Sequence, residues 1–171
     1  MRINQIEIYR NRILDVCKKS IDDETFFEKS LFEIARLAKV SRMTIYRHFS
    51  NKNEIIKNLL NNDDLEHLFK DFSCDSSFYK FFLIRNQHLF RNNVLMFLIK
   101  NNRIDLINES LREQNDYIIK KILSCKNINN ISFKFIQGGY HKSLMMWIKS
   151  QWSRSPESVA YELEKVILSL M

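Results

Sequence analysis

The chain has 171 residues and a formal net charge of +7 at pH 7, with only two glycines and one proline. Sheets and loop-rich folds need more turn-forming residues than this, so the composition favours an all-α protein of about nine helices. The length suffices for one sizeable core or for two small subdomains. The three cysteines are isolated and odd in number, which indicates a reduced, intracellular compartment.

The positive charge is concentrated in one short segment. Six Lys or Arg residues lie between positions 36 and 57 against one acidic residue, whereas residues 63–171 carry 15 basic and 12 acidic residues. A local excess of this kind indicates a polyanionic partner. The first residues contain no uninterrupted apolar run and no stretch is long enough to span a membrane, so we expect a soluble, cytoplasmic protein.

The N-terminal third predicts four helices. Helical periodicity indicates a first helix over residues 2–20. Ser30 is a suitable N-cap for a second helix, and Ser41 caps a third that runs to about His48. A fourth helix follows, and the polar run at residues 61–64 is the expected boundary between domains 1–62 and 63–171.

The rest of the chain predicts five further helices. A Pro at the first helical position, with Ser before it and Glu after it, marks the start of the last one. Apolar residues within 103–124 recur at helical spacing and place either Tyr117 or Ile118 on the buried face. In chain order the predicted helices are residues 78–90, 94–99, 103–124 and 133–151 and a last helix from Pro156, with a polar loop over residues 126–130.

The third predicted helix carries more polar side chains than a core helix needs. If Ile45 and Phe49 are buried, its outward side chains are Arg42, Met43, Tyr46 and Arg47. Arginine can form two hydrogen bonds to a guanine edge, and a methionine can contact a thymine methyl group. Phosphate contacts suit Thr44, Tyr46, His48 and Lys52, and also Ser30 at the start of its own helix. A solvated surface helix is the alternative interpretation.

Residues 30–60 resemble the helix-turn-helix of the TetR family of bacterial transcription regulators. The matching residues are Ile34-Ala35, Val40-Ser41, the run from Thr44 through Ile45, Tyr46, Arg47, His48 and Phe49, and Lys52. The resemblance implies phosphate contacts by Thr44, Tyr46, His48 and Lys52, and base reading by the exposed part of helix 41–48. It also implies an N-terminal three-helix DNA-binding domain followed by a helical domain for effector binding and dimerisation.

One position departs from the family pattern, because Lys39 replaces the glycine of the turn. A left-handed conformation costs a non-glycine residue about 1 kcal/mol. We therefore expect either a slightly strained turn or a turn of different shape, with the lysine charge close to the backbone. The complete expected DNA-binding set is Ser30, Lys39, Ser41, Arg42, Met43, Thr44, Tyr46, Arg47, His48 and Lys52.

The last two helices, by the same resemblance, pair with those of a twofold mate. Two adjacent glycines inside a helical pattern are costly unless another backbone approaches closely, and the final helix carries a full apolar stripe. Packing within one chain is the alternative. The expected dimer residues are Gly138, Gly139, Trp147, Val159, Leu163, Val166, Ile167 and Leu170.

A small-molecule pocket is a further expectation for the C-terminal domain, with Arg85 as an anion anchor. Ordinary core packing is the alternative for most of its residues, since aromatic side chains are usually buried. The effector is either a small molecule or a protein partner, as in some similar regulators. The expected lining residues are Phe78, Phe82, Arg85, Tyr117, Tyr140 and His141.

No catalytic motif is visible, since the chain has no GxSxG, no HExxH and no glycine-rich phosphate loop. The four histidines lie far apart in sequence, so neither an enzyme, a metal site nor a cofactor is expected. The sequence therefore predicts a homodimeric repressor that binds a near-palindromic double-stranded DNA operator. The alternatives are an activator that works with a protein partner, or a helical adaptor that does not bind DNA.

Overall fold

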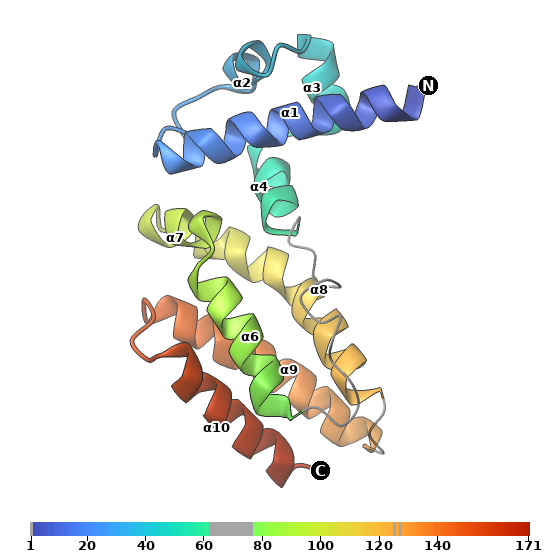
Figure 1. The fold of residues 1–171 in the computed structure, drawn as a ribbon, viewed down its shortest axis with the longest axis vertical. Helices are drawn as coiled ribbons and strands as arrows, with labels where there is room; N and C mark the ends of the chain where they lie inside the picture. The colour runs from blue at the N-terminus through green and yellow to red at the C-terminus, as the bar shows by residue number, and fades with distance from the viewer. Residues whose placement is uncertain (1, 62–76, 125, 127) are drawn as a thin grey trace. The chain divides into compact units, whose positions relative to one another are not determined.

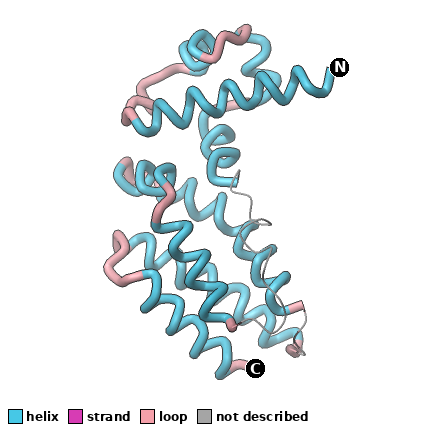
Figure 2. The backbone as a smooth tube through the Cα atoms, in the orientation of Figure 1, coloured by secondary structure: helices cyan, strands magenta, loops and turns pink. Residues whose placement is uncertain are grey.

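The computed structural model describes residues 2–61, 77–124, 126 and 128–171, and every regular element among them is an α-helix (Figure 1, Figure 2). Nine helices lie in these ranges, which confirms the all-α prediction. The chain divides into two compact units, residues 1–62 and 63–171. Residues 62–64 of the expected boundary lie outside the described residues.

The N-terminal unit consists of α1 (Arg2–Asp22), α2 (Leu31–Leu37), α3 (Arg42–His48) and α4 (Lys52–Asn61). Helix α1 contacts each of the other three, as its length beside them in Figure 1 suggests. Burying one large apolar side chain stabilises a fold by roughly 1.5–3 kcal/mol, so a small shared core suffices to fix the short α2 and α3. Its fully buried side chains include Ile13, Cys17, Phe26, Ile34, Ile45, Ile55 and Ile56.

The C-terminal unit consists of α6 (Phe78–Phe90), α7 (Asn93–Lys100), α8 (Ile104–Leu123), α9 (Asn130–Lys149) and α10 (Pro156–Ser169). Helix α6 packs along α10 and α8 along α9, while α7 contacts both α6 and α8. The core lies between these pairs. Its fully buried side chains include Phe82, Leu95, Leu98, Ile107, Ile119, Leu144, Ile148 and Ala160.

Two details of this unit differ from the predicted elements. Helix α9 begins at Asn130, three residues earlier than expected, because the Asn129 side chain accepts a hydrogen bond from the Ser132 amide at 2.9 Å. On α8, Ile118 takes the buried position, and Tyr117 is 44% exposed. A helix start can therefore be misplaced when the capping residue is read as part of a polar loop.

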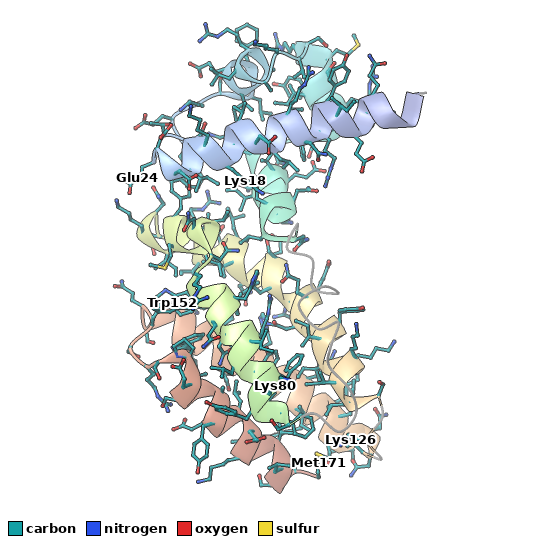
Figure 3. All side chains as sticks on the ribbon, viewed as in Figure 1. Lys18, Glu24, Lys80, Lys126, Trp152 and Met171 are labelled. Carbon is teal, nitrogen blue, oxygen red and sulfur yellow. The ribbon has the colours of Figure 1, made fainter. Side chains whose placement is uncertain are left out.

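Turns in this chain form without glycine. Four residues that follow helix ends have positive φ: Glu24 (57°), Lys39 (55°), Asn102 (55°) and Gln151 (53°). Glu24 is labelled near the end of α1 in Figure 3. Each such position costs a non-glycine residue about 1 kcal/mol, and rather less for Asn. The two glycines lie instead inside α9, where neither has a positive φ.

The turn after α9 is held by aromatic packing. Trp152, labelled in Figure 3, has a φ of 60° and its ring lies 4.5 Å from that of Trp147 and 5.6 Å from that of Phe90. Its Nε1 also donates to the sulfur of Met96 at 3.0 Å. These contacts offset the strain of a bulky residue in the left-handed region. They fix the path of the chain from α9 into α10.

The cysteines show no reactive site in the described part of the chain. Cys17 is fully buried, and burial raises the pKa of its thiol to about 12, so it packs as a small apolar residue. Cys74 and Cys125 lie outside the described residues. No described helix combines the length and the apolar character needed to cross a membrane.

Candidate nucleic-acid interface

Helix α2 starts with a reciprocal cap. The Glu33 amide donates to Ser30 Oγ at 3.2 Å, and the Ser30 amide donates to Glu33 Oε2 at 2.7 Å. The backbone N–H of Ser30 thereby holds the pKa of the Glu33 carboxyl below its usual value. This capping box makes the first turn of α2 rigid. The sequence signature of a capping box is Ser-x-x-Glu. This signature could have identified Glu33 as a residue that supports the motif, although Glu33 is not among the residues expected from the sequence.

The turn between α2 and α3 is a Schellman motif. Val40 N donates to Ala35 O at 3.0 Å, and Lys39 N donates to Arg36 O at 3.2 Å. Lys39 occupies the left-handed position with φ 55°, so the turn keeps the glycine-like shape at some cost in strain. Of the two alternatives expected for this position, the structure has the left-handed turn rather than a turn of different shape. The Lys39 side chain is exposed.

Helix α3 is anchored at its start and along one side. The Thr44 amide donates to the Ser41 hydroxyl at 3.0 Å, and the two hydroxyl groups lie 2.8 Å apart. Ile45 and Phe49 are buried, with exposed fractions of 0% and 1%. Seven residues are too few for an isolated helix to be stable in water. The cap and the buried side chains therefore account for its rigidity.

The opposite side of α3 is exposed and basic. Met43 is 72% exposed and Tyr46 is 48% exposed, and Arg42 and Arg47 are exposed beside them. The Arg42 guanidinium carbon lies 5.9 Å from the centre of the Tyr46 ring. A cation over an aromatic face loses little freedom when it binds, so this contact orients Arg42 before any ligand arrives. The structure thus brings the predicted base-reading residues together on one face.

His48 is half-buried at the end of α3. Burial lowers the pKa of its imidazole, and the charges of Arg10 and Arg47 lower it further. The ring is therefore neutral at pH 7 and can offer an N–H donor without a positive charge. A contact from His48 to a phosphate would hold the backbone of a nucleic acid without neutralising it.

Lys52 has partners other than those expected. Its Nζ donates to the carbonyl of Phe27 at 2.8 Å and to the carbonyl of Lys29 at 3.1 Å. At the same helix start, the Glu54 amide donates to Asn51 Oδ1 at 3.0 Å. The sequence predicted a phosphate contact for Lys52, and these main-chain partners, 23 and 25 residues earlier, were not visible in any local pattern.

Most of the expected effector residues lie in the interior of the C-terminal unit. Phe82 and Arg85 are fully buried, Tyr140 is 2% exposed, and the rings of Phe82 and Tyr140 lie 5.2 Å apart. Arg85 Nη2 donates to Gln114 Oε1 at 2.6 Å. Burial raises the pKa of Tyr140 to about 12, although the nearby Arg85 charge acts in the opposite direction. Tyr117 does not belong to this group, because it is exposed on α8.

His141 and Phe78 complete the buried set. His141 is 9% exposed, and its Nδ1 lies 2.9 Å from Asn115 Nδ2 while its Nε2 lies 3.0 Å from Asn108 Oδ1. Burial lowers the pKa of its imidazole, so a neutral ring with its proton on Nε2 fits both contacts. Phe78 is 5% exposed at the start of α6. All of these residues lie in the interior of the C-terminal unit.

A groove of about 560 Å³ lies between α9 and α10. Seven of the eight expected dimer residues line it, and Gly138 does not. Two lining residues that the sequence reading missed, Phe135 and Met146, are 65% and 64% exposed. Their spacing around Gly139 along α9 is the signal that could have identified them. Among the described residues of one protomer, a Cβ at either glycine would meet no atom within 4 Å, so no backbone in these residues approaches closely enough to account for them.

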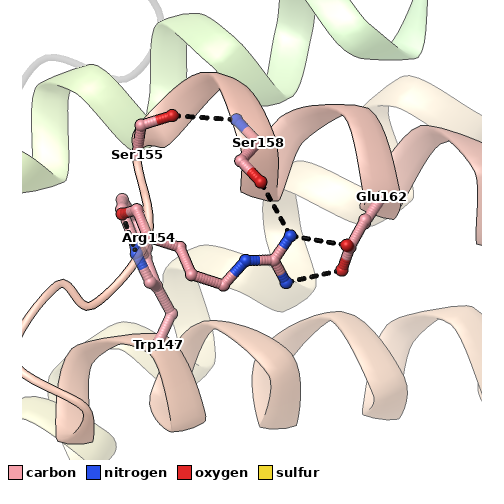
Figure 4. Close-up of polar contacts among 5 residues, drawn as sticks. All are labelled: Trp147, Arg154, Ser155, Ser158 and Glu162. Carbon is pink, nitrogen blue, oxygen red and sulfur yellow. Dashed lines mark hydrogen bonds and ion pairs between the residues drawn. The ribbon is translucent and has the colours of Figure 1, made fainter.

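The polar wall of this groove is an ion pair (Figure 4). The Arg154 guanidinium donates to both oxygens of Glu162 at 2.6 and 2.5 Å and to Ser158 Oγ at 2.7 Å. The Arg154 carbonyl accepts from Trp147 Nε1 at 2.9 Å. An exposed pair of this kind contributes little stability, but its two parallel bonds fix geometry. It ties the turn after α9 to the first turns of α10.

The first of three comparisons with known proteins finds a family model that matches part of the N-terminal unit. The model of bacterial regulatory proteins of the tetR family matches residues 13–59, which include all of α2 and α3. No curated protein sequence matches the chain.

A solved structure shows the same fold. It is the crystal structure of NalD, the secondary repressor of the MexAB-OprM multidrug efflux pump in Pseudomonas aeruginosa. The TM-score is 0.61 and the sequence identity is 19%, over 97% of this chain and 96% of that chain. At this identity the similarity shows the fold alone.

Proposed function

We propose that this chain, whose residues 13–59 match the model of the TetR family of bacterial regulatory proteins, is a DNA-binding transcriptional regulator of that family and acts as a homodimeric repressor. Each protomer inserts the exposed face of α3 into a major groove of double-stranded DNA. The observation that carries this proposal is the arrangement of Arg42, Met43 and Arg47 on the exposed side of a helix whose other side is buried. That arrangement suits direct reading of base edges.

Contacts to phosphates fix the register in this proposal. Thr44, Tyr46 and His48 flank the reading face, and Ser30 and Ser41 begin the two helices of the motif. The amide groups of a helix start favour a phosphate, as do hydroxyl groups close to them. The exposed Lys39 adds a positive charge at the turn.

The groove between α9 and α10 is the proposed dimer face. It presents projecting apolar side chains, Phe135 and Met146, next to the open space at Gly139. A twofold interface must be complementary to itself, and a face with both projections and hollows meets this condition. The charges of Arg154 and Glu162, which both line the groove, neutralise each other within the protomer. These features support a second copy as the occupant.

The proposed repressor acts on its operator as a dimer. Two α3 helices related by a twofold axis require a near-palindromic operator, with half-sites one or more helical turns apart. The similarity in fold to a repressor supports repression as the direction of regulation. A small molecule or a protein partner that alters the separation of the two α3 helices would change operator affinity. The buried polar residues Arg85, Gln114 and Tyr140 support the interior of the C-terminal unit as the place for an effector.

The test is selection of binding sites from random double-stranded DNA, followed by a salt series on the selected sequences. We expect one palindrome to be enriched, with affinity that falls steeply as salt increases because counterions are released from the phosphates. A helical adaptor that does not bind DNA would enrich nothing and show no such dependence. A direct repeat or a single half-site would contradict the twofold arrangement while preserving DNA binding.

A further inference from the structure

The Lys52 ammonium group is held by the loop between α1 and α2. Besides its hydrogen bonds to the carbonyls of Phe27 and Lys29, its Nζ lies 5.7 Å from the centre of the Phe26 ring and 5.8 Å from that of Phe27. The Lys52 side chain is half-buried and Phe26 is fully buried. Four contacts thus join the first residue of α4 to one loop.

The peptide between Lys29 and Ser30 is held at both of its polar groups. Its carbonyl accepts from Lys52 Nζ at 3.1 Å, and its N–H donates to Glu33 Oε2 at 2.7 Å. Hydrogen bonds that involve a charged partner are roughly twice as strong as neutral ones. Because this peptide immediately precedes α2, the two bonds together determine where α2 begins.

A phosphate contact by Lys52 would disrupt this arrangement. An ammonium group has three N–H donors, and two of them are directed to carbonyl oxygens here. Only the third N–H is left for another acceptor, so a phosphate that took more than one hydrogen bond would draw the side chain away from these carbonyls. The contacts therefore favour a role inside the domain over a role at its surface.

We infer that Lys52 is a positioning residue for DNA binding and does not neutralise a phosphate. It fixes the loop before α2 and so the place of the capped Ser30 end of that helix. Helix α2 contacts α3, so the same link sets the angle at which α3 meets DNA. This inference rests on the proposed DNA-binding function, and it assigns Lys52 a role that differs from the one the sequence predicted.

The test compares the salt dependence of operator binding between variants. Loss of one phosphate contact reduces the slope of log affinity against log salt by about 0.9. For Lys52→Met we expect an unchanged slope and an affinity lower by roughly tenfold at every salt concentration. Lys52→Gln keeps a hydrogen-bond donor without the charge, so it should recover part of the affinity at the same slope. Lys57→Met, on the same helix, gives the general effect of one lost positive charge.

A change in the salt slope would contradict the inference. If Lys52→Met and Lys52→Gln both reduce the slope by about 0.9 and Lys57→Met does not, Lys52 neutralises a phosphate and the inference is wrong. A wild-type protein that selects no DNA sequence would instead contradict the proposed function. The two failures are therefore distinguishable.

A second measurement on the wild-type protein does not depend on the folding of any variant. In ¹⁵N spectra of the free protein, the Lys52 ammonium should give a signal protected from rapid proton exchange, because two carbonyls hold it. Addition of the operator should leave its shift unchanged. Absence of the protected signal, or a ³¹P coupling on DNA binding, would overturn the inference.

Discussion

Replacement of Gly139 by leucine should weaken the dimer, whereas the same replacement at Gly138 should not. Both glycines lie in the middle of α9 and are exposed in the protomer, where a Cβ at either would meet no atom of the described residues within 4 Å. Only Gly139 lines the groove between α9 and α10. Gly138→Leu is therefore a matched control that differs chiefly in where the new side chain lies.

The expected magnitudes follow from the open surroundings of both sites. Leucine is a better helix former than glycine by roughly 0.8–1 kcal/mol, so both variant protomers should gain stability of that order. In the proposed dimer the second copy fills the groove, and an extra side chain there costs about 1–3 kcal/mol. Twofold symmetry places the substitution at the interface twice, so Gly139→Leu should lose at least about 2 kcal/mol and raise the dimer Kd roughly 30-fold.

Sedimentation equilibrium over a range of concentrations measures the dimer Kd, and urea unfolding of the same samples measures stability. The expected result is a weaker dimer for Gly139→Leu alone, with the unfolding free energy of both variants raised by roughly 0.8–1 kcal/mol at concentrations where each is monomeric. Equal dimer Kd values for the two variants would refute the assignment of this groove to the second copy. A loss of protomer stability in Gly139→Leu would show that the site is not open as described.

Three further predictions concern the N-terminal unit. Arg47→Ala should cost about 1–3 kcal/mol on the selected operator and relax specificity at one base position, as measured by fluorescence anisotropy; equal weakening on all sequences would place Arg47 on a phosphate instead. Lys39→Gly should raise the free energy of unfolding by about 1 kcal/mol in urea, because it relieves the left-handed strain; an unchanged or lower value would mean that the turn is not strained. The carboxyl pKa values of Glu33 and Glu54 are held below 4.5 in the folded protein, first of all by backbone N–H groups at two helix starts. Their contribution to stability is therefore complete above pH 4.5 and is lost as the pH falls below it. Urea midpoints between pH 7 and pH 3 should show a smaller decline for Glu33→Gln than for wild type, and an identical decline would contradict this assignment.

Local signals explain why most of the fold could be predicted. Ser30, Ser41 and Pro156 each mark a helix start through chemistry that acts over three or four residues, and the structure has helices at all three places. The left-handed turn at Lys39 was likewise a consequence of its immediate neighbours. Such features depend on the chain over one helical turn, so a single sequence already contains them.

Features that depend on distant partners could not be predicted in the same way. The carbonyls that hold Lys52 come from a loop 23 to 25 residues earlier, and only the packing of α4 against α1 brings that loop near. On α8, periodicity left Tyr117 and Ile118 as alternatives, and tertiary packing selected Ile118 for the interior. Phe135 lines the groove between α9 and α10 and is exposed. Its exposure follows from the packing of these two helices, which no local pattern indicates.

The central claim is that the exposed face of α3 reads a DNA sequence, and its most direct test is a parallel selection. Random double-stranded DNA is selected with the wild-type protein and with a variant that carries both Arg42→Ala and Arg47→Ala. We expect wild type to enrich one palindrome and the variant, folded to the same extent by circular dichroism, to enrich none or a relaxed version of it. Enrichment of the same palindrome by both proteins would contradict the claim.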